Sequence, residues 1–98
     1  MSKFASSVRA KVSDGNNAAF IDALKTFDTR DYPGALSHQI IDTGDGRFQT
    51  TIVWESEDAL VAARSNLIKY LDKWRHLLEE LSPELGVTDP ISGRIIDH

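Results

Sequence analysis

A stripe of apolar residues runs through the second half of the chain at the spacing of an α-helix. Four of its members lie seven residues apart, at Leu60, Leu67, Trp74 and Leu81. Other apolar residues lie one helical turn away from these, which is typical of a helix that packs one face against a core. We therefore predict a helical region from residue 57 to about residue 81. Ser65 and Asn66 are weak helix formers and good caps, so we predict a break or bend there.

The rest of the chain predicts strands and one shorter helix. Residues 4–12 alternate between apolar or small and polar side chains, as in a half-buried strand. Further strands are predicted at residues 36–41, 47–54 and about 92–97, and a helix at residues 18–27. The order β-α-β-β-α-β is that of a ferredoxin-like α+β fold, an antiparallel four-stranded sheet with helices on one face. The 98 residues fit one domain.

One face of such a sheet has no helix to cover it. The residues expected on that face are of mixed polarity, and they include Ser7, Arg9, Gln49 and Thr51. A chain of this length buries only a modest core, so docking onto a second copy would add burial. We therefore predict a homodimer in which the two sheets pack face to face.

Charge and composition argue against several classes of protein. The formal net charge of −4 disfavours a nucleic-acid partner, because phosphate binding needs clustered Lys and Arg. The chain has no apolar run of about 18 residues, so we expect no membrane-spanning helix. It has no Cys, and its His residues lack ligand spacing, so we expect no metal site. The lack of Cys and of an apolar leader fits a cytoplasmic protein.

Two segments carry a resemblance to a known family. They are SDGNNAAFIDAL (residues 13–24) and YPGALSHQIIDTGDGRFQTTIVWESEDALVAAR (residues 32–64). The chain resembles the antibiotic biosynthesis monooxygenase-like proteins of the dimeric α+β barrel superfamily, over roughly residues 3–82. The match lies in the turn at Gly15, in Pro33-Gly34, and in the acidic link from Trp54 to the second helix. The resemblance implies a sheet-to-sheet dimer with a small-molecule cleft between sheet and helices.

The resemblance implies two functions, which both stay open. The first is a cofactor-independent monooxygenase that acts on a small aromatic or quinol-like compound, with no metal or flavin. The second is a non-catalytic dimeric barrel that binds a small ligand, in a stress response or in regulation. Related haem-degrading enzymes use an Asn, a Trp and a His at places that here hold Val8, Ala62 and Asp72. Haem cleavage is therefore not expected.

His38 and Arg64 are the candidate catalytic residues. His38 lies in the predicted strand at residues 36–41, and an imidazole there could act as a general base near neutral pH. Its alternative role is that of a partly buried histidine satisfied by a neighbour or water. Arg64 could hold a carboxylate or phenolate in the cleft, or it could be solvated or paired with an Asp.

Aromatic residues are the candidate substrate-binding groups. They are Trp54, Tyr70, Trp74 and Tyr32. Tyr70 and Trp74 are four residues apart and could form the wall of a flat pocket, while Tyr32 lies in a loop and could act as a lid. Core packing is the alternative explanation for the two tryptophans and Tyr70, since large aromatics dominate core burial.

Overall fold

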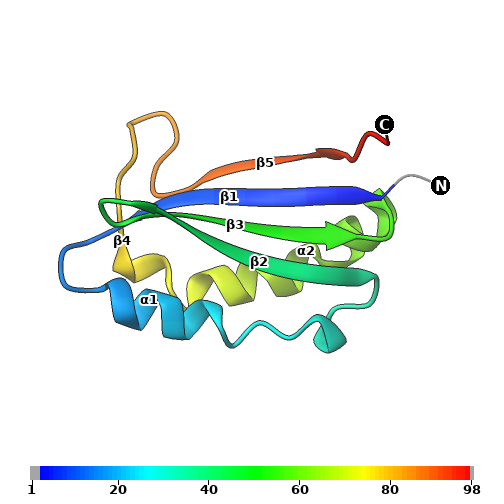
Figure 1. Cartoon of the computed structure of the whole chain (residues 1–98), viewed down its shortest axis with the longest axis horizontal. Coiled ribbons are helices and arrows are strands. Elements are labelled where there is room, and N and C mark those ends of the chain that lie inside the picture. Colours follow the sequence, from blue (N-terminus) through cyan, green and yellow to red (C-terminus); the bar gives the residue numbers. More distant parts are fainter. Residues whose placement is uncertain (1–2, 98) are drawn as a thin grey trace.

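The structure, a computed structural model, describes residues 3–97 as one antiparallel sheet with two helices on the same face (Figure 1). The elements are β1 (Phe4–Val12), α1 (Asn17–Leu24), η1 (Thr29–Asp31), β2 (Ala35–Gly44), β3 (Arg47–Trp54), α2 (Glu57–Asp72), η2 (Arg75–Leu77), β4 (Leu78–Glu79) and β5 (Asp89–Arg94). The strand order is β2-β3-β1-β4, and β5 also pairs with β1. The predicted ferredoxin-like fold is confirmed, with β4 as a fifth, very short strand.

Alternation along β1 and β3 separates the two faces of the sheet. In β3 the residues Phe48, Thr50, Ile52 and Trp54 are buried, and the residues between them are not. The register pairs Ser6 with Ile52, so the even-numbered residues of both strands face the helices. On the open face, the hydroxyls of Ser7 and Thr51 hydrogen-bond to each other at 2.8 Å.

The core lies between the sheet and the two helices. Phe20 and Leu24 anchor α1 in it, and the Phe20 ring meets Trp74 edge-on at a centroid distance of 5.3 Å. A second buried cluster forms where Trp54 meets Leu60 near the start of α2. Burial of these large side chains stabilises both helices against the sheet.

The predicted break at Ser65 and Asn66 is wrong, because α2 continues through both residues to Asp72. Both side chains point into solvent, where weak helix propensity costs only about 0.5 kcal/mol per residue. Buried residues on the same helix, including Ala63 and Tyr70, outweigh that cost. The helix ends instead just before Trp74, whose backbone leaves the helical region as its ring enters the core.

The chain beyond α2 also differs from the prediction. Leu81 is not helical but lies in the loop after β4, where its N–H donates to the carbonyl of Gly86 at 2.7 Å. β5 begins at Asp89, earlier than predicted, and includes Pro90. A proline is tolerated here because β5 is an edge strand, with β1 as its one partner within residues 3–97.

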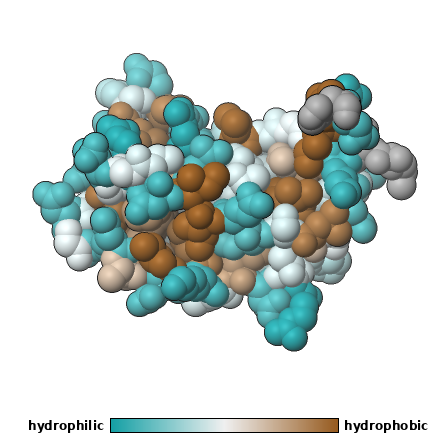
Figure 2. Space-filling view, viewed as in Figure 1, coloured by the Kyte–Doolittle hydropathy of each residue, from teal (hydrophilic) through white to brown (hydrophobic). Residues whose placement is uncertain are grey.

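Several large apolar side chains remain exposed outside the core. They include Leu36, Ile41, Val61, Ile68, Leu85, Ile91 and Ile96. Figure 2 shows that the apolar areas on the face in view are separated by hydrophilic side chains. The surface in view therefore carries scattered apolar areas and not one continuous apolar layer.

Candidate functional site

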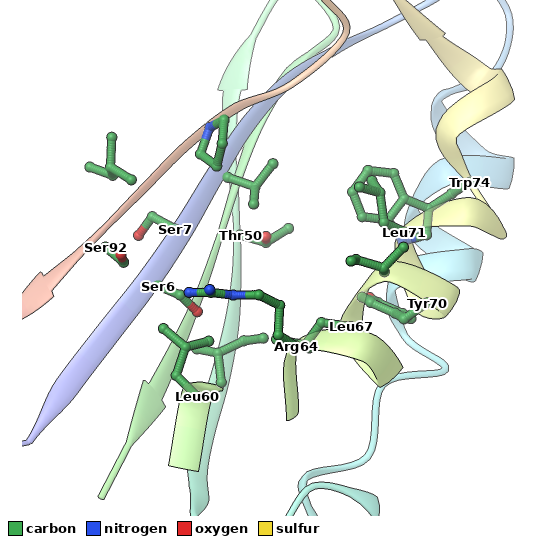
Figure 3. Close-up of a pocket in the computed structure, with 15 residues that line it drawn as sticks. Ser6, Ser7, Thr50, Leu60, Arg64, Leu67, Tyr70, Leu71, Trp74 and Ser92 are labelled. Carbon is green, nitrogen blue, oxygen red and sulfur yellow. The ribbon is translucent and has the colours of Figure 1, made fainter. Parts of the chain in front are cut away.

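A cavity of about 380 Å³ lies between α2 and the helix-facing side of the sheet (Figure 3). Residues of β1, β3, α2 and β5 line it, together with Trp74 just beyond α2: Ser6, Ser7, Val8, Thr50, Ile52, Leu60, Arg64, Leu67, Ile68, Tyr70, Leu71, Trp74, Pro90, Ile91 and Ser92. A cavity of this size matches the lower part of the range for small-molecule sites. Its wall beside β1 is β5, the edge strand at the end of the described chain.

Arg64 is the charged residue in this lining. It extends from α2 across the cavity toward the Ser6 side of the sheet (Figure 3). The ion pairs found within residues 3–97 do not involve Arg64. The remaining polar side-chain groups of the lining are hydroxyls, including those of Ser6, Thr50 and Ser92, and the indole N–H of Trp74, which is buried without a hydrogen-bond partner in the described part of the chain. The cavity can thus bind an anion that is brought by a mainly apolar molecule.

Tyr70 and Trp74 form an aromatic part of the cavity wall, with ring centroids 5.8 Å apart and nearly perpendicular planes. The Tyr70 hydroxyl donates to the backbone carbonyl of Leu24 at 3.0 Å. Burial raises the pKa of Tyr70 well above its ordinary value, so the phenol stays protonated at neutral pH. Its hydroxyl therefore ties α2 to α1, and its ring is the part that the cavity presents to a ligand.

Trp54 does not line the cavity, because it is fully buried at the end of β3. Its indole Nε1 donates to the hydroxyl oxygen of Ser6 at 3.0 Å. Ser6 is a lining residue, so Trp54 reaches the cavity only through this hydrogen bond. The helix that follows Trp54 is capped by Ser56, whose side-chain oxygen accepts from the N–H of Ala59 at 3.2 Å.

His38 and Tyr32 belong to a separate aromatic cluster around Phe27. The Phe27 ring stacks on Tyr32 at a centroid distance of 4.6 Å and lies 4.5 Å from the His38 ring. Burial lowers the pKa of His38, and its Nε2 atom is buried with no hydrogen-bond partner in the described part of the chain. Neither His38 nor Tyr32 lines the cavity. Tyr70 borders both the cavity and this cluster, because its ring centroid lies 5.4 Å from that of Phe27.

The structure thus brings Arg64, Tyr70 and Trp74 together and leaves His38 and Tyr32 outside the cavity lining. Several lining residues were not predicted from the sequence, among them Ser6, Thr50 and Ser92. The sequence did contain a signal for two of them. Ser6 and Thr50 are hydroxyl residues at helix-facing positions of alternating strands. A polar residue at such a position is uncommon in a core and indicates a hydrogen-bond partner or a cavity.

Residues 3–97 contain no group of three or more His, Asp or Glu side chains arranged to hold a metal ion. None of the helices in that range is long and apolar enough to cross a membrane.

Comparison with known proteins shows which family the chain belongs to. The family model of antibiotic biosynthesis monooxygenases matches residues 4–79, most of the chain and every strand and helix from β1 to β4. The chain belongs to the antibiotic biosynthesis monooxygenase family. Among curated proteins, no match is found.

Solved structures show the same fold at low identity. SnoaB, a cofactor-independent oxygenase from Streptomyces nogalater, is similar with a TM-score of 0.77 and 16% identity over 98% of this chain and 95% of that one. A conserved protein from Methanosarcina mazei Go1 is similar with a TM-score of 0.78 and 14% identity, over 96% of this chain and 93% of that one. A dimeric ferredoxin-like protein from an uncultured marine organism is similar with a TM-score of 0.72 and 12% identity, over 100% of this chain and 91% of that one. At such identities these neighbours establish the fold.

Proposed function

We propose that the protein is a cofactor-independent monooxygenase that oxidises a small aromatic or quinol-like compound in the α2 cavity. The observation that carries the proposal is a mainly apolar cavity with an aromatic wall and one guanidinium, that of Arg64, without a carboxylate in its lining. A cation placed in this way stabilises the anion of a bound phenol or enol. Membership of the monooxygenase family and the fold shared with SnoaB support the same chemistry.

The proposed reaction balances without a cofactor. The anion of an anthrone-type substrate is rich in electrons and reacts with molecular oxygen. The ring CH₂ group loses two hydrogens and gains one oxygen atom as a carbonyl, and the other oxygen atom leaves as water. The substrate supplies all four electrons, so no external reductant is required. The protein contributes binding, orientation and charge placement.

The source of the anion follows from the cavity lining. No carboxylate or imidazole is among the lining residues described above, so the proton of the substrate passes to solvent and Arg64 favours the ionised form. His38 would act as the base only if the cavity extended toward Phe27. Turnover that survives in His38→Ala would assign ionisation to Arg64, and turnover that is lost would return His38 to the role of base.

Oxygen consumption tests the proposal. Purified protein is supplied with dihydroxynaphthalene and anthrone-type substrates, and the Arg64→Gln variant is expected to be slower by roughly 10²–10³, the scale for removing one electrostatic stabiliser. Arg75→Gln is the matched control, because Arg75 lies in η2 outside the cavity lining and pairs with Asp72 at 3.3 Å. A wild-type protein that turns over none of these substrates would reject the oxygenase.

A non-catalytic ligand-binding protein is the second candidate, and the lack of an acid–base residue in the cavity lining favours it. A ligand that binds in the cavity and stays chemically unchanged in air would support this role. Haem degradation is not proposed. Of the places that haem-degrading relatives use, one holds Val8, an apolar residue of the lining, and the others hold Ala62 and Asp72, which are exposed.

A homodimer through the open sheet face is part of the proposal. The face carries Ile41, which is 44% exposed, beside the polar residues of β1 and β3. A hollow of about 440 Å³ lies on it between strand residues such as Arg47 and the loop residues Leu81 and Leu85. A similar fold occurs in a protein described as dimeric and ferredoxin-like. A second copy would cover this face.

A further inference from the structure

The hydroxyl of Ser6 lies at the cavity, and its hydrogen bond with Trp54 makes the hydroxyl oxygen an acceptor. Trp54 Nε1 lies 3.0 Å from Ser6 Oγ. An indole N–H can only donate, so Ser6 Oγ accepts here and its own proton remains available to another acceptor. Within residues 3–97, no hydrogen bond of the Ser6 proton is found. Ser6 thus presents a donor to the cavity that it lines.

We propose that Ser6, held in place by Trp54, and Arg64 together form an anion-binding site for an aromatic carboxylic acid. The inference rests on the proposed function and deepens it, since it names the charged group that the substrate carries beside its oxidisable ring. The carboxylate accepts from the guanidinium of Arg64 and from the hydroxyl of Ser6, while the ring lies against the apolar and aromatic walls.

The placement of Arg64 supports a ligand that brings its own charge. The side chain extends from α2 toward the Ser6 side of the cavity (Figure 3). Aliphatic residues such as Leu60 and Leu67 line the cavity beside the Arg64 side chain, and the lining contains no carboxylate. A guanidinium forms two parallel hydrogen bonds to a carboxylate. The donors of Arg64 and the hydroxyl of Ser6 therefore suit a carboxylate that the substrate carries beside its oxidisable ring.

Trp54 acts in this site as a positioning residue. It is fully buried, so its indole N–H must find an acceptor within the protein. Phe4 pairs with Trp54 and Ser6 pairs with Ile52, so Ser6 and Trp54 are diagonal neighbours on the helix-facing side of the sheet. The hydrogen bond from Trp54 satisfies the indole and also turns the Ser6 proton away from it, toward the cavity.

Binding of two nearly isosteric ligands tests the site without any oxidation step. The dissociation constants of 2-naphthoate and of the neutral 2-naphthamide are measured by calorimetry near pH 7. Wild-type protein is expected to prefer the carboxylate by at least roughly tenfold, and Arg64→Gln is expected to lose that preference. Ser6→Ala and Trp54→Phe should each reduce it by roughly tenfold, the scale of one hydrogen bond to a charged group. Ser6→Thr, which keeps the hydroxyl, should retain it.

Matched controls separate recognition of charge from loss of structure. Ser13→Ala removes a hydroxyl and Arg75→Gln a guanidinium outside the cavity lining, and both should keep the wild-type preference. Thermal unfolding shows whether Trp54→Phe is folded, and Ser6→Ala tests the same hydrogen bond if it is not. Equal affinity of wild-type protein for the two ligands would overturn the proposal. Variants at Ser6 and Trp54 that weaken both ligands alike would also overturn it, because that is the pattern of a structural role.

The two proposals fail in different ways. Neither naphthalene ligand carries an oxidisable phenol or CH₂ group, so the preference for the carboxylate would stand even if no substrate were oxygenated. Oxygenase activity without a preference for the carboxylate would overturn only the anion-binding site.

Discussion

At the scale of single residues, the two tryptophans differ in what they do. Trp54 is fully buried, and it satisfies its N–H through Ser6. Trp74 is 3% exposed, packs against Phe20 and also lines the cavity. Both are core residues, as the sequence interpretation held for large aromatics, but only Trp74 presents its side chain to the cavity.

Substitution of Trp74 by Ala tests its part in the core. The free energy of unfolding is expected to fall by roughly 3–5 kcal/mol, because a buried aromatic is lost and a cavity remains. Denaturant unfolding measures the change, and Val61→Ala on the exposed side of α2 is the control, with a change within about 0.5 kcal/mol. A loss below about 1 kcal/mol for Trp74→Ala would contradict the packing against Phe20.

The burial of His38 predicts a pH dependence of stability. Its pKa in the folded protein lies below the ordinary value of 6.5, so the unfolded state binds the proton more readily. The free energy of unfolding should fall as the pH drops below about 6.5 toward the folded pKa, and this contribution should be constant above. Unfolding measured between pH 5 and pH 8 should lose that slope in His38→Phe and retain it in the exposed His76→Gln. An unchanged slope in His38→Phe would contradict this assignment.

At the scale of elements, α2 carries the site because it stays continuous where its sequence is weakest. Ser56 caps its first turn, and Glu57 and Asp58 complement the positive end of the helix dipole. The helix then places Leu60, Arg64 and Leu67 along the cavity before it ends ahead of Trp74. A bend in the middle would have separated Arg64 from Leu67.

Two substitutions in α2 should change stability in opposite directions. Asn66→Ala is expected to stabilise by about 0.5 kcal/mol, because the side chain is exposed and helix propensity is the main difference. Ser56→Ala should destabilise by about 1 kcal/mol through loss of the cap to the Ala59 N–H. Chemical denaturation measures both. A destabilised Asn66→Ala variant would show that the Asn side chain makes a contact that the structure does not contain.

At the scale of the whole molecule, the sheet separates two environments. Its helix-facing side holds the core and the cavity, and its other side is open in the single chain. β5 takes part in both sides of the sheet. Pro90 and Ser92 line the cavity, and Asp89 forms an ion pair with Arg9 on the open face. A second copy on the open face would therefore lie next to the strand that forms one cavity wall.

Light scattering tests the proposed dimer. Wild-type protein at micromolar concentration should have twice the mass of the chain, with an interface on the order of 2,000 Å² in total. Thr51→Glu, which places a charge in the middle of the open face, should shift the protein to monomer, whereas Val61→Glu on α2 should not. A stable wild-type monomer would reject the dimer.

The sequence by itself determined the order of the two helices and the four longer strands, but not β4, and it determined the faces of β1 and β3. These are set by local periodicity, since an alternating pattern can bury only one side of a strand. It also indicated the family through the segments around Gly15, Pro33-Gly34 and Trp54. The start of α2 was readable because capping depends on neighbouring residues alone.

Only the tertiary structure decided where α2 ends and which candidate residues meet. Helix propensity predicted a break at Asn66, but packing of Tyr70 outweighed it, and burial of Trp74 ended the helix instead. His38 and Arg64 were both candidates in the sequence, but only Arg64 lines the cavity, while His38 lies beside Phe27. The hydrogen bond from Trp54 to Ser6 joins residues 48 positions apart. Such pairings depend on how β1 and β3 come together, and α1, η1 and β2 separate these two strands in the sequence, so no turn between them fixes their register.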